Sequence, residues 1–204
     1  MRVTKEQAAQ NRQHILTAAT QLFREHGIHA TGVDAITKEA GLTHGSLYSQ
    51  FGSKEAIAAA AVRFAVKRSQ HLWQRAAERQ RGTKAFRSIV ERYLSRKHRD
   101  EPGQGCVIAA LATDIARQPH SVRDAFTEEL AGVFDLLAQL VHGDDSSRRY
   151  DDAIAAFAGM TGALVLARAV NDETLSERIL QATAKRVAQP AKVRGSTRPT
   201  RRIR

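Results

Sequence analysis

The sequence contains only one cysteine, Cys106, among its 204 residues. A single cysteine excludes an intrachain disulfide and is typical of a chain that folds in a reducing compartment. At the N-terminus, no basic region is followed by an apolar run and a cleavage site of small residues, which argues against a secretory signal peptide. The longest apolar segment, residues 153–167, is interrupted by glycines and is short for a bilayer span. These absences predict a soluble, cytoplasmic protein.

The sequence also lacks the signatures of enzymes and of metal sites. It has no nucleophile elbow, no phosphate-binding loop and no zinc-protease pattern, and no neighbouring residue supplies a base for Cys106. The eight histidines are dispersed, and His26 and His29 have no further ligands near them in the sequence. We therefore expect a protein that is not an enzyme and that holds no metal ion or cofactor.

Acidic residues are fewer than basic ones, and the formal net charge is +11. Such a charge favours a polyanionic partner but does not locate the binding site. The net charge is +1 for residues 1–52, +8 for residues 53–102, −4 for residues 103–188 and +6 for residues 189–204. The last segment has too little hydrophobicity to order itself, so we expect a flexible basic tail.

Strand-like alternation is absent, whereas alanine and leucine recur at helical spacing. This pattern predicts an all-α fold of about nine helices. The expected helices cover residues 4–26, 33–40, 43–50, 53–79, 83–98, 106–117, 121–142, 148–170 and 174–188, with residues 99–105 as a loop. We expect the first domain to span residues 1–52 and the second to span residues 53–188, followed by the tail at 189–204.

Residues 33–50 have the anatomy of a helix-turn-helix, with Gly41 at the tight turn between two short helices. Ile36, Ala40, Leu42 and Leu47 are suited to pack these helices together. Near its start the second helix carries polar groups that can reach base edges and phosphates, and Gly45 allows close approach. The pattern predicts a domain that reads DNA, and the alternative is a unit that serves packing alone.

The segment HATGVDAITKEAGLTHGSLYSQFGSKEAI, residues 29–57, resembles the signature of the TetR/AcrR family. Thr31 opens the first helix of the motif, Ala40-Gly41-Leu42 form the turn, and Leu47-Tyr48, Phe51 and Ser53-Lys54-Glu55 follow in order. The sequence departs from the family pattern at Gly32, where a second Ser or Thr is usual, at Thr37 and at Ser49-Gln50. These departures concern contact detail. The resemblance covers about the first quarter of the chain.

The resemblance implies a homodimeric transcriptional regulator, expected to be a repressor that a small-molecule effector releases from double-stranded operator DNA. An N-terminal three-helix domain binds the DNA, and the helical remainder binds the effector and dimerises through the last two helices. Small residues between 153 and 169 would allow close helix approach, although an intrachain core helix would explain them equally well. The implied DNA-binding residues are Thr31, Thr43, His44, Gly45, Ser46, Tyr48, Ser49, Gln50 and Lys54.

Apolar and aromatic residues of the central helices are the candidates for the effector pocket, although core packing is the alternative for each. They are Trp73, Tyr93, Phe126, Phe134, Phe157 and Met160, with His71 as a weaker polar candidate. Cys106 is a further candidate, because it is expected in the first turn of a helix, where the helix dipole favours a reactive thiolate.

The Gly105-Cys106 pair before an apolar helix resembles a branch of the TetR family in which some members sense oxidants or electrophiles through a cysteine at this place. A redox- or electrophile-sensing repressor switched through Cys106 is therefore an alternative function, against which Cys106 is a small buried hydrophobe. A second alternative is a sequence-independent nucleic-acid-binding protein that uses its basic tail.

Overall fold

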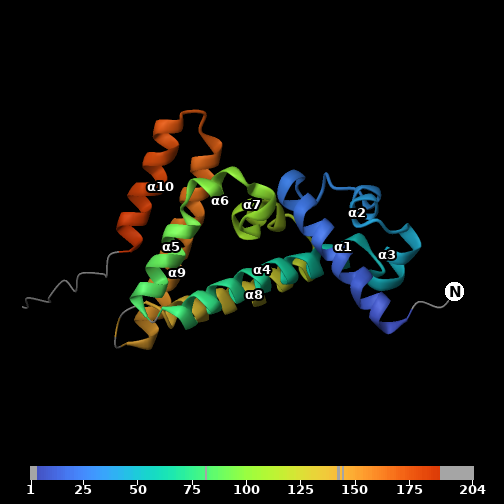
Figure 1. Ribbon diagram of the computed structural model, residues 1–204, viewed down its shortest axis with the longest axis horizontal. Helices are drawn as coiled ribbons and strands as arrows, with labels where there is room; N and C mark the ends of the chain where they lie inside the picture. Colours follow the sequence, from blue (N-terminus) through green and yellow to red (C-terminus); the bar gives the residue numbers. More distant parts are fainter. Residues whose placement is uncertain (1–3, 81, 142, 144, 189–204) are drawn as a thin grey trace, which may run out of the picture.

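The computed structural model describes residues 4–80, 82–141, 143 and 145–188, and within these ranges the chain is all-helical (Figure 1). The described residues form ten α-helices and one 3-10 helix, η1. Their bounds are α1 Lys5–His26, α2 Val33–Ala40, α3 His44–Phe51, α4 Lys54–Arg79, α5 Thr83–Tyr93, α6 Arg96–Asp100, η1 Pro102–Gln104, α7 Val107–Ile115, α8 His120–Ala138, α9 Ser146–Ala169 and α10 Glu173–Val187. The predicted tail, residues 189–204, lies outside the described residues.

Helices α1, α2 and α3 pack into a small unit, which we call the head. Its centre consists of Ile15, Phe23, Ile36 and Leu47, whose side chains are almost completely buried. Burying each such side chain stabilises the fold by about 1.5–3 kcal/mol. The apolar residues predicted to pack the helix-turn-helix therefore form one core with residues of α1, with Ala40 and Leu42 partly buried at its edge.

Helix α4 leads from the head into the rest of the molecule and lies along α8 (Figure 1). Helix α9 packs between α8 and α10, so the last two helices lie at the end of the molecule opposite the head. Helix α7 contacts α1, α4 and α9. The short segment from α6 to α7 is thus the place where the head, the long helices and the last two helices approach one another.

Helix starts follow local capping chemistry. Thr43 and Ser53 are N-caps, and their side chains accept hydrogen bonds from the backbone N–H groups of Ser46 and Ala56. Gly41 ends α2 in the left-handed conformation with φ 66° and ψ 31°. These boundaries were predictable because each depends on residues within one turn of the helix end.

The predicted helix over residues 83–98 is wrong in one respect, because the structure divides it. Helix α5 ends at Tyr93, and Ser95 then starts α6 by accepting a hydrogen bond from the N–H of His98. A serine hydroxyl offers the backbone this alternative to a continuous helix. Residues 99–105, expected to be a loop, include the end of α6 and all of η1.

One helix among the described residues, α9, is long and apolar enough to cross a membrane by length and composition alone. Its most apolar 18-residue window has a mean hydropathy of 1.3, and 33% of this window is buried inside the protein. The helix is longer than the apolar segment recognised in the sequence. Core helices of soluble proteins pass the same test, and α9 packs between two other helices.

Replacing Gly41 with alanine is expected to lower the free energy of unfolding by about 1–2 kcal/mol, because an L residue is strained at φ 66°. No atom lies within 4 Å of the position that the added Cβ would take, so the cost would come from the backbone alone. Chemical denaturation measures the change.

Gly32→Ser is the matched control, since Gly32 has the same open surroundings but a φ of −78°. As the N-cap of α2 without a side-chain hydrogen bond, this position should gain a few tenths of a kcal/mol from serine. Equal destabilisation by both variants would contradict the role assigned to the Gly41 backbone.

Candidate functional site

The turn between α2 and α3 is built by backbone hydrogen bonds around Gly41. The N–H of Gly41 donates to the carbonyl of Lys38, and the N–H of Leu42 donates to the carbonyl of Thr37 over 2.9 Å. This pairing satisfies carbonyls at the end of α2 and turns the chain sharply. As a result α3 starts at once, with its first residues at the surface.

The first turn of α3 presents polar groups to solvent. Thr43, His44, Gly45, Tyr48 and Ser49 are exposed, and Tyr48 is 46% exposed although it is aromatic. Ser46 and Gln50 are half-buried. Seven of the nine residues predicted to contact DNA therefore lie on α3 or at its cap, on one short stretch of surface.

His44 is held by a neighbour that the sequence pattern did not indicate. Its Nε2 lies 2.6 Å from Oδ1 of Asp34, which is on α2. Both side chains are exposed. The carboxylate orients the imidazole at the start of α3 and joins the two helices of the motif.

Thr31 and Lys54 are placed differently from the α3 residues. Thr31 is only 3% exposed, and its hydroxyl donates to the carbonyls of Gly27 and Leu22, so a side-chain contact with DNA, as predicted, is not possible in this conformation. These two hydrogen bonds fix the connection between α1 and α2. Lys54 is half-buried at the start of α4, and its Nζ donates to the carbonyl of His29 over 3.1 Å.

Sequence reasoning missed Arg12 on α1, which supports α3 from behind. Its guanidinium lies 4.2 Å from the centre of the Phe51 ring, and its Nη1 donates to the carbonyl of Gln50 over 3.3 Å. A cation at the C-terminal end of a helix and over an aromatic face is favourable. No local signal could have revealed this contact, because 38 residues separate Arg12 from Gln50.

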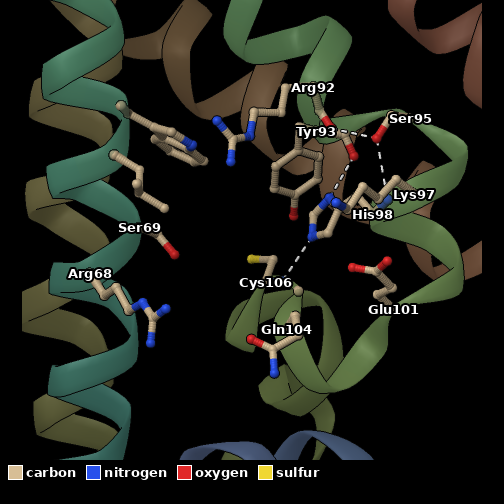
Figure 2. A pocket seen from close by; sticks show the side chains of 13 residues that line it. Arg68, Ser69, Arg92, Tyr93, Ser95, Lys97, His98, Glu101, Gln104 and Cys106 are labelled. Atoms are coloured by element: carbon tan, nitrogen blue, oxygen red, sulfur yellow. Dashed lines mark hydrogen bonds between the residues drawn. The ribbon is translucent and has the colours of Figure 1, made fainter. Parts of the chain in front are cut away.

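A pocket of about 380 Å³ lies between α4 and the α5–α6–η1 segment (Figure 2). Its size suits a small organic molecule. Residues from α4 line one side and residues from α5 to the start of α7 line the other. The lining consists of Arg68, Ser69, Leu72, Trp73, Arg92, Tyr93, Ser95, Lys97, His98, Glu101, Gln104, Gly105 and Cys106.

Three of the seven predicted effector residues, Trp73, Tyr93 and Cys106, line this pocket. The other four, Phe126, Phe134, Phe157 and Met160, do not line it. Phe157 stacks edge-to-face on Trp73, Tyr93 and Phe134, with ring centres 5.9–6.1 Å apart, and so belongs to the packing behind the pocket wall. Met160 is completely buried. His71 is exposed and does not line the pocket either.

Cys106 precedes α7 as its N-cap residue rather than standing in the first turn, and its side chain forms no capping hydrogen bond. It is 8% exposed. Figure 2 shows its Sγ facing the pocket from the side opposite Arg68 and Ser69. The thiol is therefore a buried group on the wall of a cavity.

Two hydrogen bonds fix the protonation of His98. Its Nδ1 lies 2.6 Å from the carbonyl oxygen of Tyr93, which can only accept, so Nδ1 carries the hydrogen. Its Nε2 accepts from the backbone N–H of Cys106 over 2.8 Å, so Nε2 carries none. The imidazole is thus neutral. Burial, and the positive charges of Arg168, Arg92 and Arg24, lower the pKa of His98 against the effect of the Tyr93 carbonyl.

Side chains from both ends of the molecule hold the segment that carries the pocket wall. Arg24 on α1 donates to the carbonyl of Gly105 over 2.8 Å. Arg168 on α9 donates to the carbonyls of His98 and Arg99. Asp114 on α7 accepts the N–H of Ile28, in the head, over 2.6 Å. A displacement of the pocket wall would therefore strain the hydrogen bonds that join it to the head and to α9.

The chemistry available here is recognition. Among the residues that the structure describes, no group of three His, Cys, Asp or Glu side chains is placed to hold a metal ion. The α3 surface offers hydrogen-bonding groups on a helix narrow enough for the major groove of DNA, and the pocket offers arginines beside aromatic rings.

The family model of bacterial regulatory proteins of the tetR family matches residues 15–61, which contain most of α1, all of α2 and α3 and the start of α4. The uncharacterized HTH-type transcriptional regulator Rv0196 of Mycobacterium tuberculosis is 28% identical over 171 residues, 80% of this chain and 87% of that protein. The HTH-type transcriptional regulator AcrR of Shigella flexneri is 43% identical over 53 residues, 26% of this chain and 25% of that protein.

Solved structures share the whole fold. The reduced form of Escherichia coli NemR superposes with a TM-score of 0.73 at 21% identity, over 87% of this chain and 94% of that one. A TetR-family transcriptional regulator from Cytophaga hutchinsonii gives a TM-score of 0.74 at 18% identity, over 92% and 97%. At these identities the likeness concerns the fold, including the region after the head that the family model does not reach.

Protonation of His98 should destabilise the protein. Its folded-state pKa lies below the usual 6.5, so as the pH falls from 6.5 through the lowered value the unfolded chain takes up a proton that the folded chain excludes. The free energy of unfolding is therefore expected to be full above pH 6.5 and to decline below it. Denaturation at fixed chain concentration between pH 5 and pH 8 measures this.

His98→Gln removes the titrating group and should flatten this decline, whereas His71→Gln, on an exposed histidine, should not. At neutral pH, His98→Ala is expected to cost about 1–3 kcal/mol, because it leaves the Cys106 N–H and the Tyr93 carbonyl without partners. The same slope in the wild type and in His98→Gln would refute the assignment.

Proposed function

The chain belongs to the TetR family of bacterial transcriptional regulators, and we propose that it represses transcription as a homodimer that a small molecule releases from its operator. The observation that supports this most strongly is the polar face of α3. It is exposed at the end of a rigid three-helix head and rests on Arg12 and Asp34. We expect the protein to act in the cytoplasm, where its DNA partner is.

The proposed reading face is the start of α3. Thr43, His44 and Ser49 offer hydrogen-bonding groups to base edges, and Gly45 has no side chain to hinder approach. The Tyr48 hydroxyl and the Lys54 ammonium are suited to the phosphates on either side. One α3 reads only a few base pairs, so a specific site needs two heads on a near-palindromic operator, with half-sites about 34 Å apart.

The surface of α9 supports dimerisation. One stripe of this helix is exposed and contains only small and apolar residues, which are Ile154, Ala155, Ala158, Gly159, Gly162, Val165, Leu166 and Ala169. Leu166 is 57% exposed, and Leu175 on α10 is 45% exposed. An uncharged stripe of this length is unusual on a monomer, and a two-fold axis would bury it against the same stripe of a second copy.

The pocket wall supports release by an effector. Arg24 and Asp114 connect it to the head, and Arg168 connects it to α9. A ligand that fits the pocket better in one spacing of the two heads than in the other shifts the population toward that spacing. If the preferred spacing does not match the operator, the ligand lowers the affinity for DNA.

Selection from a random duplex library with the full chain should yield one near-palindromic sequence. Tyr48→Phe should then lower the affinity for it about tenfold, because one hydrogen bond to a charged phosphate is lost from each head. Tyr150→Phe, on the half-buried tyrosine of α9, should leave this affinity unchanged. Gel shift measures both variants.

Leu166→Glu should give a monomer that binds the operator much more weakly. Light scattering measures the oligomeric state, and gel shift measures the affinity.

Sequence-independent binding with a steep loss of affinity in salt would overturn the proposal and favour the alternative in which the basic residues 189–204 bind nucleic acid. Tight palindrome binding by a Leu166→Glu monomer would refute dimerisation through α9 while leaving the reading face intact.

A second candidate function is electrophile sensing through Cys106. The position of its Sγ on the pocket wall favours it, and Escherichia coli NemR, which shares the fold, was solved in a form described as reduced. In the simplest reaction the thiol adds across an activated C=C bond. A C–S bond forms at one carbon, the π bond breaks, and the proton ends on the other carbon. The bulk of the adduct would then enter the pocket.

N-ethylmaleimide tests this function, because Cys106 is the only cysteine and any adduct is located unambiguously by mass. Modification is expected to lower the affinity of the wild type for its operator at least tenfold, measured by gel shift, and to leave Cys106→Ser unaffected. Full modification of the wild type without loss of DNA binding would exclude Cys106 as the switch.

A further inference from the structure

The pocket carries an excess of positive charge. Arg68 comes from α4, Arg92 from α5 and Lys97 from α6, whereas Glu101 is the only acidic residue among the lining. His98 contributes no charge, because its two hydrogen bonds keep it neutral. Figure 2 shows the guanidinium groups of Arg68 and Arg92 extending from opposite sides into the space that Ser69 and Cys106 also face.

These cations are not used by the fold. Elsewhere in the described part of the chain, cations of the same region pair with carboxylates, as Arg63 does with Glu128 and Arg99 with Glu173. Arg68, Arg92 and Lys97 form no such salt bridge with any described residue. Their charges remain available to a ligand.

A third guanidinium lies behind the pocket. A small adjoining cavity of about 20 Å³ is lined by Arg24 and Arg68, and both cavities share Gln104. The Nε of Arg24 is buried and has no hydrogen-bond partner among the described residues. Burial, and then the charge of Arg68, lower the pKa of Arg24 to about 10, so at neutral pH it adds a positive charge to the same region.

Apolar and aromatic side chains line the same α4 and α5 walls of the pocket. Leu72 is 44% exposed, and the half-buried indole of Trp73 lies edge-to-face to Tyr93, with ring centres 6.2 Å apart. The phenol of Tyr93 already contacts Thr161 through its hydroxyl, so its ring is what the pocket can use. This wall suits an apolar, flat group.

We infer that the ligand of this pocket is an organic anion with an apolar body, held at its charged group by Arg68 and Arg92 and at its body by Leu72 and Trp73. The inference rests on the proposed function, since it names the chemical class of the effector. A guanidinium binds carboxylate or sulfonate oxygens with directed, charge-assisted hydrogen bonds. An uncharged molecule of the same shape would gain the apolar contacts alone.

Two fluorescent probes separate the charge from the body. 8-Anilinonaphthalene-1-sulfonate is an aromatic anion, and N-phenyl-1-naphthylamine has the same rings without the sulfonate. Binding of each to the full chain can be followed through the quenching of Trp73, the only tryptophan. We expect the anion to bind more tightly to the wild type, and the neutral probe to displace it in competition.

Arg68→Gln and Arg92→Gln should each weaken binding of the anionic probe about tenfold and leave binding of the neutral probe unchanged. Unchanged binding of the neutral probe would show that the pocket is intact in these variants. Arg75→Gln on α4 and Arg87→Gln on α5 remove exposed arginines from the same helices outside the pocket and should change neither probe. Equal affinity of the wild type for both probes, or an unchanged anion affinity in both pocket variants, would overturn the inference.

The operator complex separates this inference from the proposed function. If the anion binds with the expected arginine dependence but no operator is found, the proposed function fails and the anion pocket stands. If operator binding is specific but the two probes bind alike, the regulator stands and the anion pocket fails. Release of the operator by the anionic probe, weakened in Arg92→Gln, would support both.

Discussion

The arrangement of this protein depends on the short backbone segment from Gly103 to Cys106. Arg24 holds its Gly105 carbonyl from the head, and His98 holds the Cys106 N–H from α6. Arg168 on α9 in turn holds the carbonyl of His98. A Cβ at position 105 would lie 2.8 Å from Nη2 of Arg168 and 3.0 Å from the His98 ring, so a larger residue there would displace side chains that hold this segment. This short segment thereby joins the head, the pocket and the last two helices.

Many of the basic residues have a structural role or line the pocket. The segment 53–102 is the most basic part of the folded chain, and a basic segment is readily taken for a DNA-binding surface. In the structure, Arg63, Lys67, Arg96 and Arg99 pair with carboxylates of α8 and α10. Arg68 and Arg92 line the pocket instead. The positive charge of residues 53–102 is therefore found in internal ion pairs and in the lining of the pocket, and it does not by itself mark a DNA-binding surface.

The head, the turn at Gly41 and the caps at Thr43 and Ser53 could be predicted from the sequence because each is decided by neighbours along the chain. The break of the predicted helix 83–98 was harder to predict, since Leu94 continues the apolar pattern of the helix and a serine such as Ser95 can stand inside a helix as well as at its start. The burial of Thr31 was also hidden, because its hydroxyl is used by carbonyls of α1 and of the connection that follows it.

Only some of the pocket residues could be predicted from the sequence, because the lining depends on contacts between helices that are distant along the chain. Aromatic residues predicted for the pocket are interleaved in one cluster, and whether a ring faces the cavity or the core depends on how α4, α5 and α9 pack. Trp73 and Tyr93 face the cavity, and Phe157 contacts both of them from behind.

Specificity for DNA and response to a ligand place opposite demands on the two ends of this molecule. The head is nearly neutral, so under the proposed function its affinity for DNA has to come from directed contacts by groups such as Tyr48 and His44, which depend on the exact placement of α3. Contacts of that kind are lost when two heads are displaced by a small amount, whereas a diffuse positive surface would tolerate the displacement. The charge of Arg68 lowers the pKa of Arg24, which indicates repulsion between the two, and an anion bound as we propose would relieve it. In the proposed mechanism the low charge of the head and the high charge around the pocket therefore act together, because the first makes DNA binding sensitive to the geometry of the dimer and the second lets a ligand change that geometry.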